Sequence, residues 1–279
     1  MGHHYIPQFY LRGFGSNGRI WAHDRERRIS FQSSVKSIAN EKGMYSEEIE
    51  SFLANRIETP AISALIKIRK QEKISFDERT ALARYIVFLC KRVPDSRERA
   101  LKTVPGVADQ LHGEIAAELD AAAVANPAFA DRVPSLKARV AAAIEGHKSR
   151  PSPALWYSSF ESEPGAQLVK ALLSMNWVFM SSTQLQFLTS DNPVFFFKSE
   201  GIGRQKSELS VPLSSSIALW ATRSPGPSGE FMNVAPVAVR EVNRRTVYDS
   251  TRFVYSGTDE PWVLPFVTKG RWQLTRLIR

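Results

Sequence analysis

Cysteine is almost absent from this 279-residue chain, which contains only Cys90. A single cysteine excludes an intramolecular disulfide and argues against a site in which several thiolates hold a metal. Long apolar runs are also missing, since no stretch approaches the ~18 residues that a membrane-spanning helix needs. No basic segment followed by an apolar one opens the chain. We therefore expect a cytoplasmic protein with no membrane partner, in which Cys90 is buried and inert.

The common catalytic signatures are missing as well. The sequence has no G-x-S-x-G elbow, no H-E-x-x-H motif, no Walker loop and no G-x-G-x-x-G that opens a helix. Gly201-Ile202-Gly203 is not followed by a helical pattern, so we interpret it as a turn. Nucleophilic serine chemistry therefore has no support in the sequence.

The composition is that of a globular protein with a basic surplus. Hydrophobic residues make up 43% of the chain, charged residues make up 23%, and the formal net charge is +9. Such a balance favours anionic partners such as RNA or phosphate-bearing ligands. Bases and acids are interspersed, however, so a merely scattered basic surface explains the surplus too. No helix is dense in Arg, Lys, Asn and Gln, which argues against sequence-specific DNA binding.

Hydrophobic periodicity and turn residues predict an α+β fold. A short helix begins at Pro7 and a hairpin pairs residues 19–24 with 29–33. A helical middle layer follows, and a largely antiparallel sheet forms the C-terminal part. Helices are expected at 46–58, 62–68, 75–93, 106–125, 134–147, 164–174 and 239–249. Strands are expected at 177–182, 187–190, 194–198, 208–213, 217–222, 252–256, 262–267 and 271–278.

A polar, proline-rich stretch at 148–153 marks the change between the two halves. We expect one region at 1–150 and a second at 151–279, packed as one globular unit.

The segment His3–Phe14 (HHYIPQFYLRGF) is the most informative part of the chain. It is too rich in apolar and aromatic side chains for a free terminus or an expression tag, so we expect it to dock into the core. Its short helix has to stop before Phe14, which predicts a left-handed backbone with positive φ at Gly13. On that interpretation Gly13→Ala costs ~1 kcal/mol.

Docking would fix His3 and His4 at a defined place. Imidazole titrates near neutrality and serves as proton shuttle, phosphate donor or metal ligand. Adjacent histidines in an extended segment point to opposite sides, so His4, next to the docked Tyr5, is the stronger catalytic candidate and His3 the weaker. Alternatively, both imidazoles tie down the chain by hydrogen bonds.

Ser190-Asp191-Asn192-Pro193 interrupts two very apolar strands, so a rigid scaffold positions its polar groups. Asn192 and Pro193 have a sufficient explanation as turn residues. One Asx residue is enough for a turn, which makes Asp191 a catalytic candidate. Ser190 and Asn192 are then candidates for substrate binding, and Pro193 is structural.

Three arginines are candidates for an anion cradle: Arg12, Arg84 and Arg92. Arg84 and Arg92 are eight residues apart on one expected helix and can share a face. Arginine binds phosphate bidentately, which lysine does not. Glu58 interrupts an apolar helix face, and a structural ion pair with an arginine is its favoured interpretation.

Four segments carry a resemblance to a bacterial family catalogued as domain of unknown function 4238. They are HHYIPQFYLRGF, MYSEEIESFLANRIETPA, RYIVFLCKRVPDSRER and FLTSDNPVFFF, and they occur in the family's order between residue 3 and about residue 197. The third segment has Val93 where a Thr is common in the family. The resemblance implies no activity, cofactor or substrate.

The leading hypothesis from the residues is a hydrolase that acts on a phosphodiester, with RNA favoured. His4 is the acid or base, Asp191 orients it or holds a metal, and Arg12 and Arg92 stabilise charge on phosphate. No cofactor is required, no residue is predicted as a metal ligand, and a divalent metal stays open. The alternatives are a non-catalytic module that binds a small anionic ligand or a partner protein, and a structural protein whose motifs serve packing. The sequence leaves the oligomeric state open.

Overall fold

A computed structural model describes residues 2–149, 156, 164–226, 228–270 and 272–277. The chain forms two compact units, one from residues 1–94 with 162–279 and the other from residues 95–161. The boundary expected between residues 150 and 151 lies outside the described residues, and that division stays a prediction. The fold is α+β, as the sequence predicts.

The N-terminal segment is tied by backbone hydrogen bonds to residues 39–42. Strand β1 (Gly2–His4) pairs antiparallel with β4 (Asn40–Lys42), and Tyr5 N donates to Ala39 O at 3.0 Å. The short helix α1 (Gln8–Leu11) buries Tyr10 and Leu11 completely. The expected hairpin is present as β2 (Arg19–Asp24) and β3 (Ile29–Ser34). Docking of the first residues into the core therefore rests on both backbone pairing and apolar burial.

The next helices run almost without interruption. They are α2 (Glu47–Phe52), the π-helical η1 (Leu53–Glu58), α3 (Thr59–Arg69) and α4 (Phe76–Lys91). Ser46 caps α2, and Ser75 with Glu78 forms a complete capping box at the start of α4. Pro60 is tolerated because it lies in the first turn of α3. Cys90 in α4 is half-buried rather than fully buried.

A five-stranded sheet forms the main layer, with strand order β10-β5-β9-β8-β7. Its strands are β5 (Asn176–Ser181), β7 (Phe195–Phe196), β8 (Glu208–Pro212), β9 (Ile217–Thr222) and β10 (Glu230–Asn233). All pairs are antiparallel except β10 with β5, which is parallel. The sequence predicts this antiparallel character but not the parallel edge strand.

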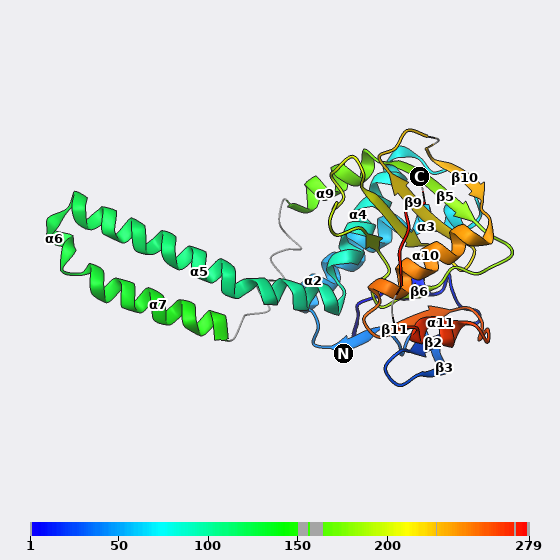
Figure 1. Cartoon of the computed structure of the whole chain (residues 1–279), viewed down its shortest axis with the longest axis horizontal. Helices are drawn as coiled ribbons and strands as arrows, with labels where there is room; N and C mark the ends of the chain where they lie inside the picture. The colour runs from blue at the N-terminus through cyan, green and yellow to red at the C-terminus, as the bar shows by residue number, and fades with distance from the viewer. Residues whose placement is uncertain (1, 150–155, 157–163, 227, 271, 278–279) are drawn as a thin grey trace. The chain divides into compact units, whose positions relative to one another are not determined.

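Helices cover both faces of this sheet. Val178 and Met180 of β5 pack against Val239 and Val242 of α10 (Pro236–Asp249), which lies across one face (Figure 1). Trp177 points to the opposite face, where the guanidinium of Arg79 from α4 lies 4.7 Å from its ring. Helix α9 (Pro164–Leu173) lies beside α4. Successive β5 side chains therefore serve two different helical layers, as strand geometry requires.

A smaller sheet has the order β3-β2-β11-β6. Strand β11 (Phe253–Ser256) pairs antiparallel with β2 on one side and with β6 (Thr189–Ser190) on the other. Helix α11 (Val263–Thr268) and the end of α10 cover it through a cluster of buried apolar side chains: Leu188, Val247, Val254, Val263 and Val267. The two sheets therefore share α10 as a common packing partner.

The second unit consists largely of a helical hairpin. Helix α5 (Pro94–Ala125) and helix α7 (Val133–Ser149) are joined by the short α6 (Pro127–Ala130). The turn predicted around Asn126-Pro127 is present, and Asn126 caps α6 through Ala128 N.

Two expected C-terminal strands are wrong. Residues 262–267 form α11 instead of a strand, and no strand occurs in the described part of 271–278. The apolar, partly β-branched composition of Trp262–Val267 favours a strand on propensity alone. Val263 and Val267 are the residues buried under the small sheet, and their spacing of four fits one face of a helix.

The backbone expectation for Gly13 is also wrong. Gly13 is not among the glycines with positive φ, because two turn-type bonds, Gly13 N to Tyr10 O and Phe14 N to Leu11 O, continue the right-handed path. Glycine is required here for a different reason. A Cβ on Gly13 would lie 2.6 Å from Cζ of Arg69, whose guanidinium donates to the carbonyl oxygens of Phe9, Tyr10 and Leu213.

We therefore predict that Gly13→Ala lowers the free energy of unfolding by about 1–3 kcal/mol, because the added methyl group displaces the partly buried Arg69 guanidinium from its carbonyl partners. Chemical denaturation measures this change. Gly203→Ala is the matched control, because nothing lies within 4 Å of a Cβ at that position. Equal midpoints for the two variants would contradict the role assigned to Arg69.

Candidate functional site

The two N-terminal imidazoles are engaged by backbone groups. His4 Nε2 donates to Lys36 O at 3.1 Å, which fixes the proton on that nitrogen because a carbonyl only accepts. His3 Nδ1 accepts from Tyr45 N at 3.2 Å, and the centroids of the His3 and Tyr45 rings are 5.8 Å apart. Both contacts match the alternative interpretation in which the histidines tie down the chain.

Arg92 lies at the centre of a buried polar cluster next to this segment. Its side chain is 2% exposed, forms an ion pair with Glu58 and donates to His4 O. Tyr45 donates its hydroxyl to Arg92 O at 2.6 Å, and the guanidinium faces the Tyr45 ring at 5.7 Å. The facing carboxylate and phenol groups raise the pKa of Arg92, which outweighs the effect of burial. This guanidinium is enclosed and already paired.

The other two candidate arginines lie elsewhere and point to solvent. Arg12 is exposed and reaches only Gln8 Oε1, at 3.4 Å. Arg84 is exposed on α4 and lines a shallow cavity of about 150 Å³ together with Arg56 and Asp77. Arg84 lies on α4 and Arg92 is the C-terminal cap of the same helix, but Arg84 is exposed whereas Arg92 is buried. Burial therefore sets Arg92 apart from the two exposed arginines, and an anion cradle of all three stays a prediction.

The Ser-Asp-Asn-Pro loop is a buried connector between β6, β11 and α10. Asp191 accepts three backbone N–H groups, from Thr251 at 2.8 Å, Arg252 at 2.7 Å and Phe253 at 2.8 Å. Asn192 Nδ2 donates to Asp249 O at 3.1 Å and lies 3.4 Å from Asp249 Oδ2.

The flanking residues complete this connector. Ser190 Oγ accepts from Asn192 N at 3.2 Å, and Pro193 is buried. Ser190, Asp191 and Asn192 thus hold backbone or helix-end groups in place.

Burial dominates the electrostatics of Asp191. Its side chain is almost enclosed, and desolvation raises its pKa to about 6 in spite of the three N–H donors. Tyr5 lies close enough for the two groups to interact, and burial together with the Asp191 charge raises the pKa of Tyr5 to about 12. Tyr5 is therefore the point at which the N-terminal segment approaches the loop.

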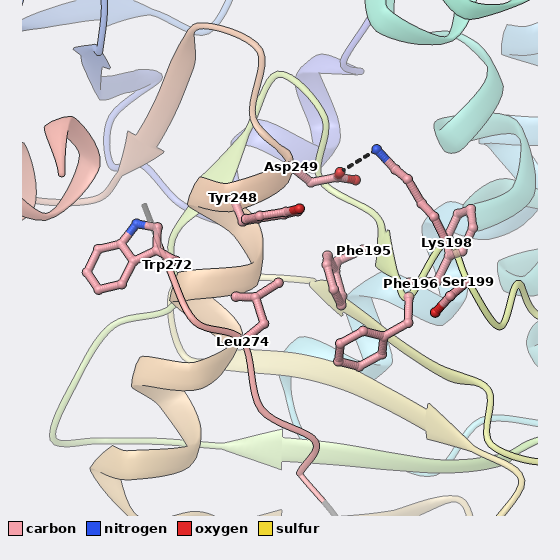
Figure 2. A pocket seen from close by; sticks show the side chains of 9 residues that line it. Phe195, Phe196, Lys198, Ser199, Tyr248, Asp249, Trp272 and Leu274 are labelled. Atoms are coloured by element: carbon pink, nitrogen blue, oxygen red, sulfur yellow. Dashed lines mark ion pairs between the residues drawn. The ribbon is translucent and has the colours of Figure 1, made fainter. Parts of the chain in front are cut away.

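A cavity opens where this loop continues into the next strand (Figure 2). It has a volume of about 340 Å³ and combines aromatic walls with one ion pair. Lys198 Nζ lies 3.1 Å from Asp249 Oδ1, and the Lys198 side chain is 60% exposed. The lining residues are Phe195, Phe196, Phe197, Lys198, Ser199, Tyr248, Asp249, Trp272 and Leu274. We call this the aromatic cavity.

A second cavity of about 350 Å³ adjoins the aromatic cavity and shares Tyr248 and Trp272 with it. Arg25 lines this second cavity and caps the C-terminal end of α10, where Nη1 donates to Val247 O at 3.2 Å and Ser250 O at 2.9 Å. Its Nε and Nη2 make no hydrogen bond to any described residue. Tyr248 is 55% exposed, so its ring is available from both cavities.

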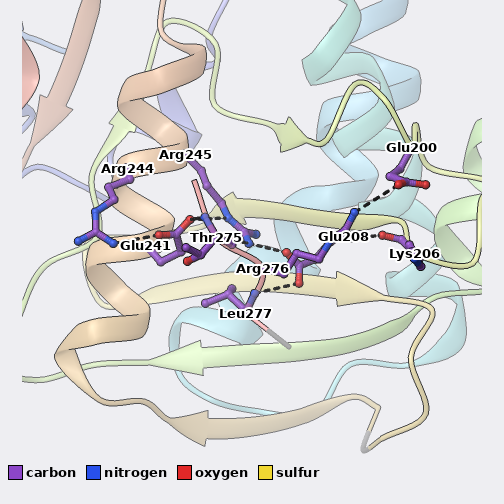
Figure 3. A network of polar contacts seen from close by, with 9 residues as sticks. All are labelled: Glu200, Lys206, Glu208, Glu241, Arg244, Arg245, Thr275, Arg276 and Leu277. Atoms are coloured by element: carbon purple, nitrogen blue, oxygen red, sulfur yellow. Dashed lines mark hydrogen bonds and ion pairs between the residues drawn. The ribbon is translucent and has the colours of Figure 1, made fainter. Parts of the chain in front are cut away.

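Trp272 and Leu274 form the C-terminal wall of the aromatic cavity. Two buried carboxylates hold the residues that follow this wall (Figure 3). Glu241 accepts from Thr275 N at 2.8 Å, and Glu208 accepts from Leu277 N at 3.1 Å. Arg245, fully buried, forms ion pairs with both carboxylates and donates to Thr275 O at 2.8 Å. These bonds hold the residues that follow Leu274 against α10 and β8.

The Arg245 guanidinium also supports Phe195 and Phe197, which we call the floor of the aromatic cavity. Arg245 faces the rings of Phe195 and Phe197 at 5.3 and 5.2 Å. One buried arginine therefore links the C-terminal wall of the cavity to its floor.

A further cavity has a different character. It encloses about 670 Å³ between the loops at 14–16, 182–186, 215–216 and 257–262. Hydroxyl and amide side chains predominate among its lining residues, Glu260 is the one charged group, and no Lys or Arg lines it. Lysine and arginine side chains line the aromatic cavity, its neighbour and the cavity beside Arg84 instead.

Comparison with known families identifies the chain. A family described as "Protein of unknown function (DUF4238)" matches residues 2–260. The chain belongs to this family. The match covers Phe195–Ser199, Tyr248 and Asp249 and leaves out Trp272 and Leu274, so only part of the aromatic cavity falls within it. No curated protein and no solved structure gives a significant match.

None of the residues that line the aromatic cavity of this DUF4238 protein, Lys198, Tyr248 and Trp272 among them, is predicted as a site residue from its sequence. Tyr248 is an aromatic residue on the outer side of a helix whose apolar face is turned inward, which is a usable signal. Trp272 has no such signal, because its place depends on the bonds that Thr275 and Leu277 make to distant carboxylates.

The described residues also bear on metals and membranes. They contain no group of three or more His, Cys, Asp or Glu side chains placed to hold a metal ion. None of the described helices combines the length and the apolar character that a membrane crossing demands.

We predict that Arg92→Leu lowers the free energy of unfolding by about 3–5 kcal/mol, because it leaves the Glu58 carboxylate, which is only 18% exposed, without its partner and His4 O without its donor. The matched control is Arg84→Leu, an exposed position on the same helix, with an expected change within about 0.5 kcal/mol. Thermal and chemical denaturation report both. A small effect of Arg92→Leu would show that the pair adds little to the fold.

A second prediction concerns pH. The folded protein binds the Asp191 proton more tightly than the unfolded chain does. Protonated Asp191 therefore adds to the free energy of unfolding, and this contribution is complete below pH ~4. It is lost as pH rises through about 6. The loss amounts to about 3 kcal/mol, from ~1.4 kcal/mol for each unit of pKa difference.

Unfolding free energies of the wild type and Asp191→Asn, measured from pH 4 to 7, isolate this contribution. As pH rises from 4 to 7, the unfolding free energy of the wild type should fall relative to that of Asp191→Asn. A constant difference would mean that the three N–H donors offset the burial of the carboxylate.

Proposed function

We propose that this DUF4238 protein is a binding protein for a small anionic ligand that carries an aromatic ring, of which a nucleotide is the model case. The observation that carries this proposal is the pair of adjoining cavities that share Tyr248 and Trp272 and have Lys198 and Arg25 at their edges. Each volume lies in the range of small-molecule sites, ~300–1,000 Å³.

The aromatic side chains supply the first half of the recognition. Tyr248 is exposed, and Figure 2 shows its ring between Trp272 on one side and Phe195 on the other. A planar heterocycle that stacks on such a ring gains about 1–3 kcal/mol. Phe195 and Phe197 are held by Arg245, so the floor does not have to reorganise when a ligand enters.

The cations supply the second half. Lys198 is more than half exposed, and among the described residues it pairs only with Asp249, so a phosphate group can compete for its ammonium group. Arg25 keeps Nε and Nη2 available while Nη1 caps α10. By contrast, Arg92 is enclosed in its pair with Glu58 and is unsuited to receive a ligand.

The hydrolase hypothesis, with His4 and Asp191 as acid and base, stays a prediction. Binding is favoured here because Asp191, the expected partner of His4, instead accepts three consecutive backbone N–H groups, and the Nε2 of His4 donates to Lys36 O. The three contacts of Asp191 oppose the exchange of its proton with a substrate or with His4.

Calorimetric titration with adenosine 5′-monophosphate and with a short single-stranded RNA tests the proposal. Tyr248→Ala and Lys198→Gln should each weaken binding roughly tenfold or more, since ~1.4 kcal/mol corresponds to a factor of ten. Phe76→Ala removes an aromatic ring that is 74% exposed, and Lys70→Gln removes an exposed lysine. Both lie outside the two cavities and should leave affinity unchanged.

The same samples decide between binding and hydrolysis. Chromatography of the RNA after incubation, with and without divalent metal, should show intact RNA for the wild type. Cleavage that is lost in His4→Ala would replace the binding proposal by the hydrolase. Absence of binding to either probe, or equal weakening by the control variants, would overturn the assignment of the cavities.

A further inference from the structure

The cavity that we call the polar cavity lies between the loops at 14–16, 182–186, 215–216 and 257–262. All four loops belong to the unit of residues 1–94 and 162–279, which we call the pocket-bearing unit. The volume of the polar cavity, about 670 Å³, is in the range of small-molecule sites, ~300–1,000 Å³. Among the described residues, none lines both this cavity and the aromatic cavity or its neighbour. It is therefore a separate candidate for a binding site.

Backbone hydrogen bonds tie three of these loops together. Ser215 N donates to Gly13 O at 2.9 Å, immediately before the first loop. Ser182 N donates to Ser216 O at 3.0 Å, which joins the second loop to the third. Bonds between main-chain groups do not depend on side-chain rotamers, so a ligand does not have to order these loops when it binds.

The fourth loop is held by Gln186 and by a close glycine contact. Gln186 Nε2 donates to Thr258 Oγ1 at 2.9 Å, and Gln186 Oε1 accepts from Gly257 N at 3.1 Å. A Cβ on Gly257 would lie 2.7 Å from Phe14 O, so glycine allows the fourth loop to approach the first this closely. The polar cavity is therefore preformed, which lowers the cost of binding.

Polar side chains with free hydrogen-bonding capacity line the cavity. Ser16, Thr183 and Gln184 are exposed, and their side chains make no hydrogen bond to any described residue. Hydroxyl groups both donate and accept, and the glutamine amide has two donors and an accepting oxygen. A ligand that itself carries several hydroxyl groups matches these side chains, because each of its groups also donates and accepts.

Glu260 and Trp262 supply two more specific groups. The exposed Glu260 carboxylate accepts from Thr258 Oγ1 at 3.3 Å and can accept further hydroxyl groups in strong, charge-assisted hydrogen bonds. Trp262 is partly buried, because it packs against the apolar cluster under the small sheet, and its ring meets that of Phe266 edge-on at 5.6 Å. The ring that lines the polar cavity is therefore fixed before a ligand enters.

We propose that the polar cavity binds a neutral, polyhydroxylated ring, that is, a sugar. Its hydroxyl groups pair with Glu260, Gln184 and the neighbouring hydroxyl side chains, and the C–H groups on one face of the sugar ring pack on Trp262. No described Lys or Arg lines the cavity, so a phosphate group has no countercharge there. Cleavage of a glycosidic bond takes a pair of carboxylates, and Glu260 is the one described acid in the lining. The proposal is therefore one of binding.

Proton–nitrogen correlation NMR of the full chain tests this proposal through the indole N–H signals of its tryptophans. D-Glucose, D-galactose, D-mannose and D-ribose are titrated separately, up to high millimolar concentrations. At least one of these sugars should shift the signal of Trp262 and leave that of Trp272 in place, because Trp272 lines the other cavities. Trp262→Phe assigns the signal and keeps an aromatic ring beside Phe266.

Two variants in the cavity should weaken sugar binding. Glu260→Gln removes a charged acceptor and should raise the dissociation constant roughly tenfold, and Gln184→Ala should raise it about threefold. Both side chains are exposed, so neither substitution removes a core contact. Asp259→Asn and Gln205→Ala are the matched controls, because both residues are exposed and neither lines the polar cavity. They should leave the dissociation constant unchanged.

The outcomes separate this proposal from the nucleotide proposal. Adenosine 5′-monophosphate, titrated in parallel, should shift the Trp272 signal, so failure at the aromatic cavity is seen independently of failure here. The sugar proposal is overturned if none of the sugars shifts Trp262, or if the control variants weaken binding as much as Glu260→Gln. It is equally overturned if trialanine or choline chloride shifts Trp262 and no sugar does, which would assign the cavity to a peptide or to a cation.

Discussion

The pocket-bearing unit depends on one buried carboxylate. Asp191 receives three consecutive backbone N–H groups at the start of β11, where the small sheet meets the end of α10. A protein interior penalises an unpaired carboxylate heavily, so the loop has few other ways to place this side chain. Its neighbour Asn192 then fixes Asp249, which in turn holds Lys198. The aromatic cavity inherits its geometry from this chain of contacts.

Local signals in the sequence account for most of the observed elements. Ser75 with Glu78 marks the start of α4, and the alternating residues of 19–24 and 29–33 give the hairpin. Elements whose existence depends on distant partners are the ones missed: β10 forms because β5 offers a parallel edge, and α11 because the small sheet buries one helical face. Tertiary packing overrides propensity in both cases.

The candidate site shows the same division between local and distant causes. Glu58 opposite Arg92 follows from the rule that a charge on an apolar helix face needs a partner. That Arg92 is enclosed while Arg84 is exposed does not follow from spacing, because residues on one helix can meet different neighbours. The reason for Gly13 could not be predicted from the sequence either. Glycine is needed there because Arg69, from a helix far along the chain, approaches closely, and not because φ is positive.

Arginine serves two opposite purposes in this protein, and the difference bears on function. Arg69, Arg92 and Arg245 are surrounded by carbonyl oxygens or carboxylates, where each guanidinium satisfies groups that burial would otherwise leave unpaired. Releasing one of them to bind a phosphate would expose those acceptors to the same penalty. Cations available to a ligand must therefore be ones that the fold does not need for itself. Lys198, which is 60% exposed, meets that condition at the aromatic cavity, and this supports the proposal of a site there rather than beside the N-terminal histidines.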